Sequence, residues 1–237
     1  MSLNPTTLQT LITLVRQRTN TENSQFVLDT ELTSYLNNAL CILDGILIEQ
    51  YNDYKLKHVI IPVTSINQLA LPADFLKLRG VDAAFDLTLP DGYLRLDEYD
   101  FEKRNSFSFP TLPTVTSPRG MLYRLQDQYI ELVPSAIAAT WQYQIWYTPD
   151  YIPLVNPSDT LQSYMDSQNW YQYAVFAASA DVLAKQDLDS SFFLAKCAEL
   201  KEHIQKLSAP NRNSGEPKAI VDTNRSYGGQ FPYGYSW

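Results

Sequence analysis

The stretch DTELTSYLNNALCILDGIL, residues 29–47, decides much of the fold. Apolar side chains recur in it every three or four residues, which places them along one side of an α-helix. Asp29 stands at a position where a capping side chain is favoured. We therefore predict a long amphipathic helix from Asp29, with an apolar face made of Leu32, Tyr35, Leu36, Ala39, Leu40, Leu43, Ile46 and Leu47.

The helical spacing continues on the N-terminal side of this stretch and is lost on its C-terminal side. Pro5 has a fixed φ that suits a helix start, and the aliphatic residues after it predict an amphipathic helix over 5–18. After Asn52 the pattern changes to short β-type segments punctuated by Pro and Gly, namely 58–63, 68–71, 76–85 and 93–96.

A hairpin and a further strand complete this β-type block. Segments 121–125 and 129–133 flank a polar turn, and the alternation that follows predicts a third strand with Trp141, Tyr143, Ile145 and Tyr147 on one face. The Ser-, Pro- and Thr-rich residues 105–119 precede the hairpin. We expect them to form a long exposed loop that carries contacts.

Helical spacing returns after Pro157. Asp159 or Thr160 is placed to cap a long helix that reaches Gln186. Asp189 or Ser190 is placed to cap a last helix, whose apolar face is Phe193, Cys197, Leu200, Ile204 and Leu207. Each long helix has a single apolar face to bury, so we expect the helices to pack against one another.

These elements predict an α+β fold, with an antiparallel α-helical bundle, a β-rich insertion between the second and third long helices, and an extended C-terminal tail. The predicted division assigns residues 1–54 and 155–207 to the bundle, 55–154 to the insertion and 208–237 to a C-terminal arm. The arm has few aliphatic residues and cannot build a core of its own. We expect it to bind a partner through Tyr227, Phe231, Tyr233, Tyr235 and Trp237.

The composition limits the classes of partner. The chain has 26 acidic and 18 basic residues, and its net charge of -8 argues against a large surface that grips nucleic-acid phosphates. The longest apolar run, residues 40–48, contains Asp44 and is too short to cross a bilayer, so we expect a soluble protein that is not secreted. The content of 16 Tyr, 10 Phe and 4 Trp suits either large interfaces or a β-rich core.

Residues that could carry chemistry are few. His58 and His203 are the only histidines, and no nucleophile elbow, zinc-binding pair or glycine-rich phosphate loop occurs. Carboxylates cluster at 97–102 and at Asp187 and Asp189, where a solvated helical turn and a helix cap are the favoured interpretations. We predict no catalytic residue, no cofactor and no metal site, and the two cysteines are expected to be small buried apolar residues.

The succession of segments resembles the head-to-tail adaptor (connector) proteins of tailed bacteriophages. The segments that carry this resemblance are, in chain order, LITLVRQRTN (11–20), LTSYLNNAL (32–40), LALPADFLKLRGVD (69–82), YLRLDEYDFEKRN (93–105), YRLQDQYIELVP (123–134), WQYQIWYTPD (141–150) and WYQYAVFAASADVLAKQDLDSSFFLAK (170–196). The resemblance implies a helical bundle with a β-rich insertion. It carries over no catalytic residue.

The resemblance also implies a role. Adaptors of this kind are structural virion proteins at the head-tail junction, made in the host cytoplasm. They form a homo-oligomeric ring, commonly a dodecamer, that binds the portal protein and tail or nozzle proteins. DNA passes through the ring channel without specific binding, and no membrane is involved.

Two other functions remain open from the residues alone. A virion carbohydrate- or receptor-binding protein could stack sugars on Trp141 and Trp146. A metal-assisted hydrolase could use the acidic cluster near Asp97, although adjacent carboxylates are common on solvated surfaces.

Overall fold

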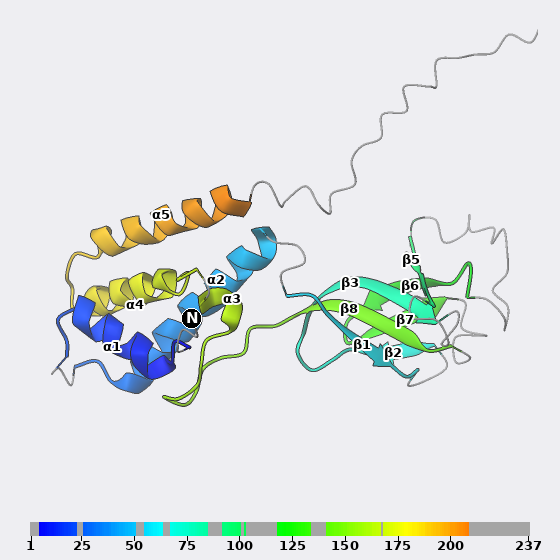
Figure 1. Cartoon of the computed structure of the whole chain (residues 1–237), viewed down its shortest axis with the longest axis horizontal. Coiled ribbons are helices and arrows are strands. Elements are labelled where there is room, and N and C mark those ends of the chain that lie inside the picture. The colour runs from blue at the N-terminus through cyan, green and yellow to red at the C-terminus, as the bar shows by residue number, and fades with distance from the viewer. Residues whose placement is uncertain are drawn as a thin grey trace, which may run out of the picture.

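The computed structural model describes residues 5–22, 26–50, 55–63, 67–84, 92–100, 102, 118–133, 141–166 and 168–208. Within them, five helices form a helical region and eight strands form a sheet region, and the two regions lie side by side (Figure 1). The chain leaves the helical region after its second helix and returns to it after its last strand.

The helices are α1 (Leu8–Arg18), α2 (Asp29–Gln50), α3 (Ser163–Asp166), α4 (Gln172–Lys185) and α5 (Ser191–Ser208). The predicted helices over 5–18 and from Asp29 are confirmed. Thr7 caps α1, because its hydroxyl accepts a hydrogen bond from the backbone N–H of Thr10 at 3.3 Å. The apolar faces of α1 and α2 meet in a shared core with α4, which includes Val15, Leu40 and Val175, each fully buried.

The single helix predicted to reach Gln186 is wrong. It is divided into the short α3 and the longer α4, and Asn169 between them adopts a left-handed backbone conformation with φ of 57°. Trp170, which follows the break, is only 3 % exposed. The break lets the Trp170 ring enter the helical core. The sequence does not predict the break, because the apolar spacing on either side of it fits one continuous helix.

The strands are β1 (Lys57–Ile61), β2 (Gln68–Ala70), β3 (Phe75–Ala84), β4 (Tyr93–Arg95), β5 (Asp97–Glu98), β6 (Leu122–Gln126), β7 (Tyr129–Val133) and β8 (Tyr143–Pro149). They form two four-stranded sheets, with the orders β1-β8-β3-β4 and β2-β7-β6-β5. The hairpin is confirmed as β6 and β7, whose turn contains Asp127 with φ of 38°. All strand pairs are antiparallel except β5 with β6 among the described strands.

Alternate side chains from both sheets meet in a second core. Val81 and Ile145 come from one sheet, and Leu69, Ile130 and Leu132 come from the other; all five are fully buried. The two sheets therefore pack face to face. Tyr143, on the central strand β8, is also fully buried in this core.

The predicted antiparallel helical bundle with a β-rich insertion is wrong. The described residues form an α+β fold with five helices and two four-stranded sheets. The physical reason is that the strands close over an apolar core of their own, separate from the core of the helices. The sequence showed the period of each strand, but it did not show that two sheets would bury their faces against each other.

The two cysteines differ in environment. Cys197 is buried on α5, and burial raises the pKa of its thiol to about 11. Cys41 is exposed on α2, so the expectation of two buried cysteines is wrong for this position. None of the described helices is both long enough and apolar enough to pass through a bilayer.

Candidate interaction surfaces

The acidic cluster near Asp97 lies at the edge of a sheet. Asp97 and Glu98 form β5 and are both exposed, and Asp100 accepts a hydrogen bond from the backbone N–H of Glu102 at 3.0 Å. Among the described residues, no group of His, Cys, Asp and Glu side chains is arranged to hold a metal ion. Asp97 begins a strand instead of the solvated helical turn that we expected.

The second pair of carboxylates lies at the corner between α4 and α5. Asp189 accepts hydrogen bonds from the backbone N–H and the hydroxyl of Ser191, both at 2.9 Å. These bonds lower the pKa of the Asp189 carboxyl below its ordinary value. The capping interpretation is confirmed for Asp189, while Asp187 occupies a left-handed turn with φ of 55°.

The two tryptophans expected to stack a sugar face different directions. Trp141 packs against the sheet core, together with the inward-facing residues of β8. Trp146 lies on β8 with the opposite alternation, and its indole N–H donates to the Asp82 carboxylate at 2.5 Å. The structure therefore does not bring them together into one platform.

Arg124, a basic residue of the sheet region, has partners within the chain. The guanidinium of Arg124 on β6 forms an ion pair with Glu131, its cross-strand neighbour on β7. It also lies 5.7 Å from the centre of the Tyr99 ring. A contact of Arg124 with another subunit would have to compete with these partners.

A buried ion pair joins the two regions. The Lys55 ammonium lies 2.8 Å from the Asp44 carboxylate of α2, and the side chains are 7 % and 3 % exposed. The Tyr164 hydroxyl donates to the same carboxylate at 2.5 Å, and the Lys55 ammonium also donates to the backbone carbonyl of Asp150 at 3.3 Å. Lys55 therefore contacts α2 and the segment by which the chain returns from β8.

A second junction uses one amide side chain of α2. The Asn37 amide oxygen accepts hydrogen bonds from the Tyr151 hydroxyl and from the backbone N–H of Leu154, both at 2.9 Å. The Asn37 amide nitrogen donates to the Leu154 carbonyl at 2.8 Å. The returning segment is thus held on α2 by short polar contacts, in addition to the burial of the Leu154 side chain.

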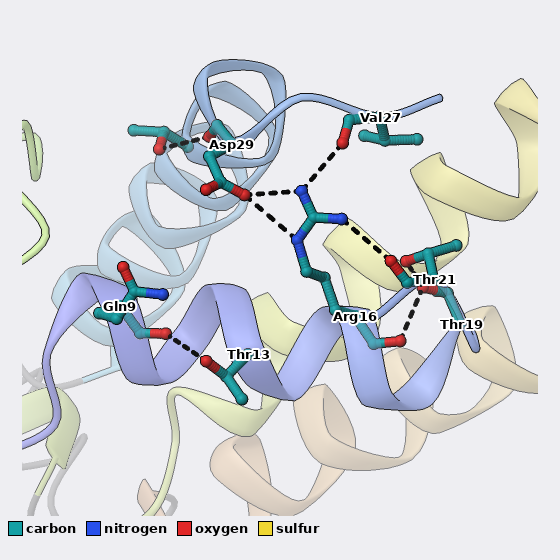
Figure 2. A network of polar contacts seen from close by, with 8 residues as sticks. Gln9, Thr13, Arg16, Thr19, Thr21, Val27 and Asp29 are labelled. Carbon is teal, nitrogen blue, oxygen red and sulfur yellow. Dashed lines mark hydrogen bonds and ion pairs between the residues drawn. The ribbon is translucent and has the colours of Figure 1, made fainter. Parts of the chain in front are cut away.

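Arg16 holds the connection between α1 and α2 (Figure 2). Its guanidinium donates to the backbone carbonyls of Thr21 and Val27, each at 3.0 Å, and forms an ion pair with Asp29 at 2.6 Å. Thr19 and Thr21, both buried, share a hydroxyl hydrogen bond of 2.8 Å at the start of the same connection. This Arg16 network sets the path of the chain into α2.

The Arg16 network supports an exposed apolar surface. Phe26 and Leu28 follow the connection and are 56 % and 61 % exposed, and Leu188 and Phe192 at the α4–α5 corner are 56 % and 62 % exposed. The two connections lie at the end of the helical region away from the sheets (Figure 1). We name these four residues the end patch. The sequence does not predict it, because Phe26 and Leu28 show no periodic apolar spacing.

Lys185 of α4 links the two halves of the end patch. Its ammonium lies 4.9 Å from the centre of the Phe26 ring, and it donates to the Phe26 carbonyl at 3.2 Å and to the Glu31 carboxylate at 2.6 Å. The hydrogen bond from Lys185 lowers the pKa of Glu31, and the bond to Glu31 raises the pKa of Tyr35 to about 12. Lys185 therefore holds the Phe26 side of the end patch against α4 and α2.

The partner-binding residues predicted from the sequence, Tyr227, Phe231, Tyr233, Tyr235 and Trp237, lie outside the described residues, as does almost all of the loop 105–119. His58 is exposed on β1 and His203 is exposed on α5. The described side chains supply contact surfaces and internal ion pairs, and no constellation of a nucleophile with a base occurs among those named here.

Comparison with known proteins gives one result that covers most of the chain. A family model described as SU10 adaptor protein matches residues 6–214, which span both the helical and the sheet regions. No curated protein matches the chain.

Proposed function

The chain belongs to the SU10 adaptor protein family, and from this premise we propose that it is a structural subunit of a bacteriophage particle, placed at the head-tail junction. The membership confirms the resemblance to head-to-tail adaptors that the sequence suggested. The match over residues 6–214 is the observation that carries the proposal, because it includes the five helices and eight strands of the described residues.

In the proposed assembly, copies of the chain form a ring of about twelve that binds the portal protein on one side and tail proteins on the other. DNA passes through the ring without being held. The net charge of -8 per chain supports this part, because a closed ring of such subunits repels a phosphate backbone instead of gripping it.

The exposed apolar side chains support a role in assembly. The end patch offers Phe26, Leu28, Leu188 and Phe192 to a partner on a surface that the Arg16 network and Lys185 hold in place. Large exposed aromatic and aliphatic groups on fixed backbone are typical of protein contact sites. We propose that the end patch packs against a neighbouring protein in the particle.

The C-terminal arm is the second proposed contact. Tyr227, Phe231, Tyr233, Tyr235 and Trp237 would gain buried area on a partner surface that residues 208–237 cannot supply themselves. We also keep the division into residues 1–54 with 155–207, residues 55–154 and residues 208–237 as a proposal about units that move or fold together.

Native mass spectrometry of the purified chain, alone and mixed with the portal protein of the same phage, tests this function. We expect a complex that contains the portal and a fixed multiple of the chain, with about twelve copies. Phe26→Asp tests the end patch and should weaken this complex. Val155→Asp is a matched control, because Val155 is 72 % exposed on the β8–α3 connection. A chain that stays monomeric and does not bind the portal would contradict the proposal.

A further inference from the structure

The outer edge of β1 is open for pairing in the described part of the chain. β1 pairs with β8 along its full length, from Lys57 with Tyr147 to Ile61 with Tyr143, and with none of the other described strands. An edge strand presents a row of backbone N–H and C=O groups that can pair with an added strand. Lys57, His58 and Ile60 are exposed along this edge.

An apolar and aromatic surface borders this edge on the outer face of the sheet. Residues paired across antiparallel strands share a face, so His58, Trp146 and Gly80 lie in one row across β1, β8 and β3. The His58 and Trp146 rings lie 4.8 Å apart between their centres. Ile60 lies in the next row on the same face and is 53 % exposed.

The row ends at Gly80, which is itself buried. A side-chain carbon added there would meet nothing within 4 Å, so no side chain packs directly over this position. The indole N–H of Trp146 already donates to Asp82, which satisfies its one polar group. What remains is a surface of His58, Ile60 and Trp146 beside a strand edge that no described strand pairs with, and we name it the β1 shelf.

The last residues of the chain have a matching pattern. In FPYGYSW, residues 231–237, every second residue is aromatic: Phe231, Tyr233, Tyr235 and Trp237. Period two places all four rings on one side of an extended strand. The small residues between them would occupy the other side.

Proline does not prevent this segment from pairing at an edge. Backbone N–H groups of successive strand residues point to opposite lateral sides, and Pro232 belongs to the alternate set that contains Gly234 and Ser236. If the aromatic residues direct their backbone groups toward β1, the missing N–H of Pro232 faces away from the sheet. Strand addition combines such backbone pairing with pockets or surfaces for alternate side chains.

We propose that residues 231–237 of one copy add as a strand to the outer edge of β1 in a second copy, with their aromatic side chains on the β1 shelf. This inference rests on the proposed function, in which copies of the chain assemble. An arm that bound its own chain would not connect one copy to another. Residues 209–237 follow α5, and a segment of this length spans roughly 95 Å when extended at about 3.3 Å per residue. A contact that joins two different surfaces on two copies of the same chain is the kind that closes rings.

Photocrosslinking in the full-length chain tests the contact. Tyr233 is replaced by p-benzoylphenylalanine in unlabelled chain, which is mixed with ¹⁵N-labelled chain of natural sequence and irradiated. We expect crosslinks from position 233 to a labelled peptide that contains residues 57–61. The substitution Ile60→Lys in the labelled chain should lower their yield at least about tenfold, because it puts a charge on the apolar surface.

A matched control separates this effect from general changes in the sheet region. Leu125 on β6 is 45 % exposed, similar to Ile60, but belongs to the other sheet. Leu125→Lys should leave the crosslink yield within about twofold. Circular dichroism of both variants checks that the sheets are intact.

The outcomes separate this contact from the proposed function. Crosslinks confined to unlabelled peptides of the same molecule, or to the portal protein in a mixture with it, would overturn the contact with a second copy. If the full-length chain forms a multi-copy complex with the portal and Ile60→Lys does so equally well with unchanged crosslinks, the contact is wrong and the adaptor function stands. Failure of the full-length chain to associate with itself or the portal would reject both.

Discussion

The helical and sheet regions are held together by different kinds of contact. In the helical region, single side chains of one helix hold a connection or another helix, as when Arg16 of α1 binds the Val27 carbonyl or Lys185 of α4 binds Glu31 of α2. In the sheet region, ion pairs run between neighbouring strands or corners, as with Arg124 and Glu131 or Lys57 and Asp74. The helical region fixes its connections, whereas the sheet region mainly reinforces strand pairing.

This difference indicates where partners can act. Hydrogen bonds from Arg16 and Lys185 hold the backbone at Val27 and Phe26, beside the exposed side chains of Phe26 and Leu28, and a surface held in this way loses little conformational entropy when it binds. The outer edge of β1 instead offers backbone N–H and C=O groups. A partner segment must become ordered as a strand to pair with them. We expect rigid packing at the end patch and strand addition at the β1 shelf.

Breaking the ion pair between the regions should have the largest effect. Lys55→Met leaves the Asp44 carboxylate buried with the Tyr164 hydroxyl as its remaining donor among the bonds described here. We expect a loss of about 3–5 kcal/mol in the free energy of unfolding, because a buried charge without its partner is strongly unfavourable. Urea unfolding followed by tryptophan fluorescence measures it.

The matched control is Lys57→Met. Lys57 lies two residues along the chain and pairs with Asp74 at 3.0 Å, but its side chain is 53 % exposed. Exposed pairs contribute about 0–1 kcal/mol, so this variant should stay close to the natural chain. Equal losses for the two variants would show that the junction is no more important than a surface pair.

Removing the Arg16 network should have an intermediate effect. Arg16→Met takes away the donors to Thr21, Val27 and Asp29. We expect a loss of about 1–3 kcal/mol, because two backbone carbonyls lose hydrogen bonds to a charged donor. Amide hydrogen exchange should also become faster at residues 26–28, and unchanged exchange there would mean that Arg16 does not hold the connection.

The smallest expected effect is a pH dependence of stability at the hydrogen bond between Tyr35 and Glu31 of α2. Tyr35 donates to Glu31, and its pKa is raised to about 12 from an ordinary 10.0. A raised folded pKa gives stability that is present below pH 10 and is lost as the pH rises from 10 through about 12. Melting temperatures from pH 9 to 12 should therefore fall more steeply for the natural chain than for Tyr35→Phe, and parallel curves would contradict this.

Local patterns in the sequence predicted the elements better than their assembly. The spacing in α1 and α2 and the alternation in β8 each depend on a single buried face, so one sequence suffices to see them. The break at Asn169 was missed because the apolar residues on both sides continue to fit a helix. The pairing of β1 with β8 joins strands separated by most of the sheet region, and no local signal specifies it.

The candidate surfaces were predicted less well. Phe26 and Leu28 have no periodic pattern, so their exposure depends on the path that Arg16 imposes on the chain. Lys55 and Asp44 were visible as charges, but only the fold buries them together. The aromatic residues of the arm stay a sequence prediction, because Tyr227 to Trp237 lie outside the described residues.

A cryo-EM reconstruction of the intact phage particle tests the central claim most directly. The account predicts a ring of this chain between the portal and the first tail protein, with both the helical and the sheet regions recognisable in each subunit. Density for this chain at a tail fibre or on the capsid shell, or its absence from the particle, would contradict the claim that it is a head-tail adaptor.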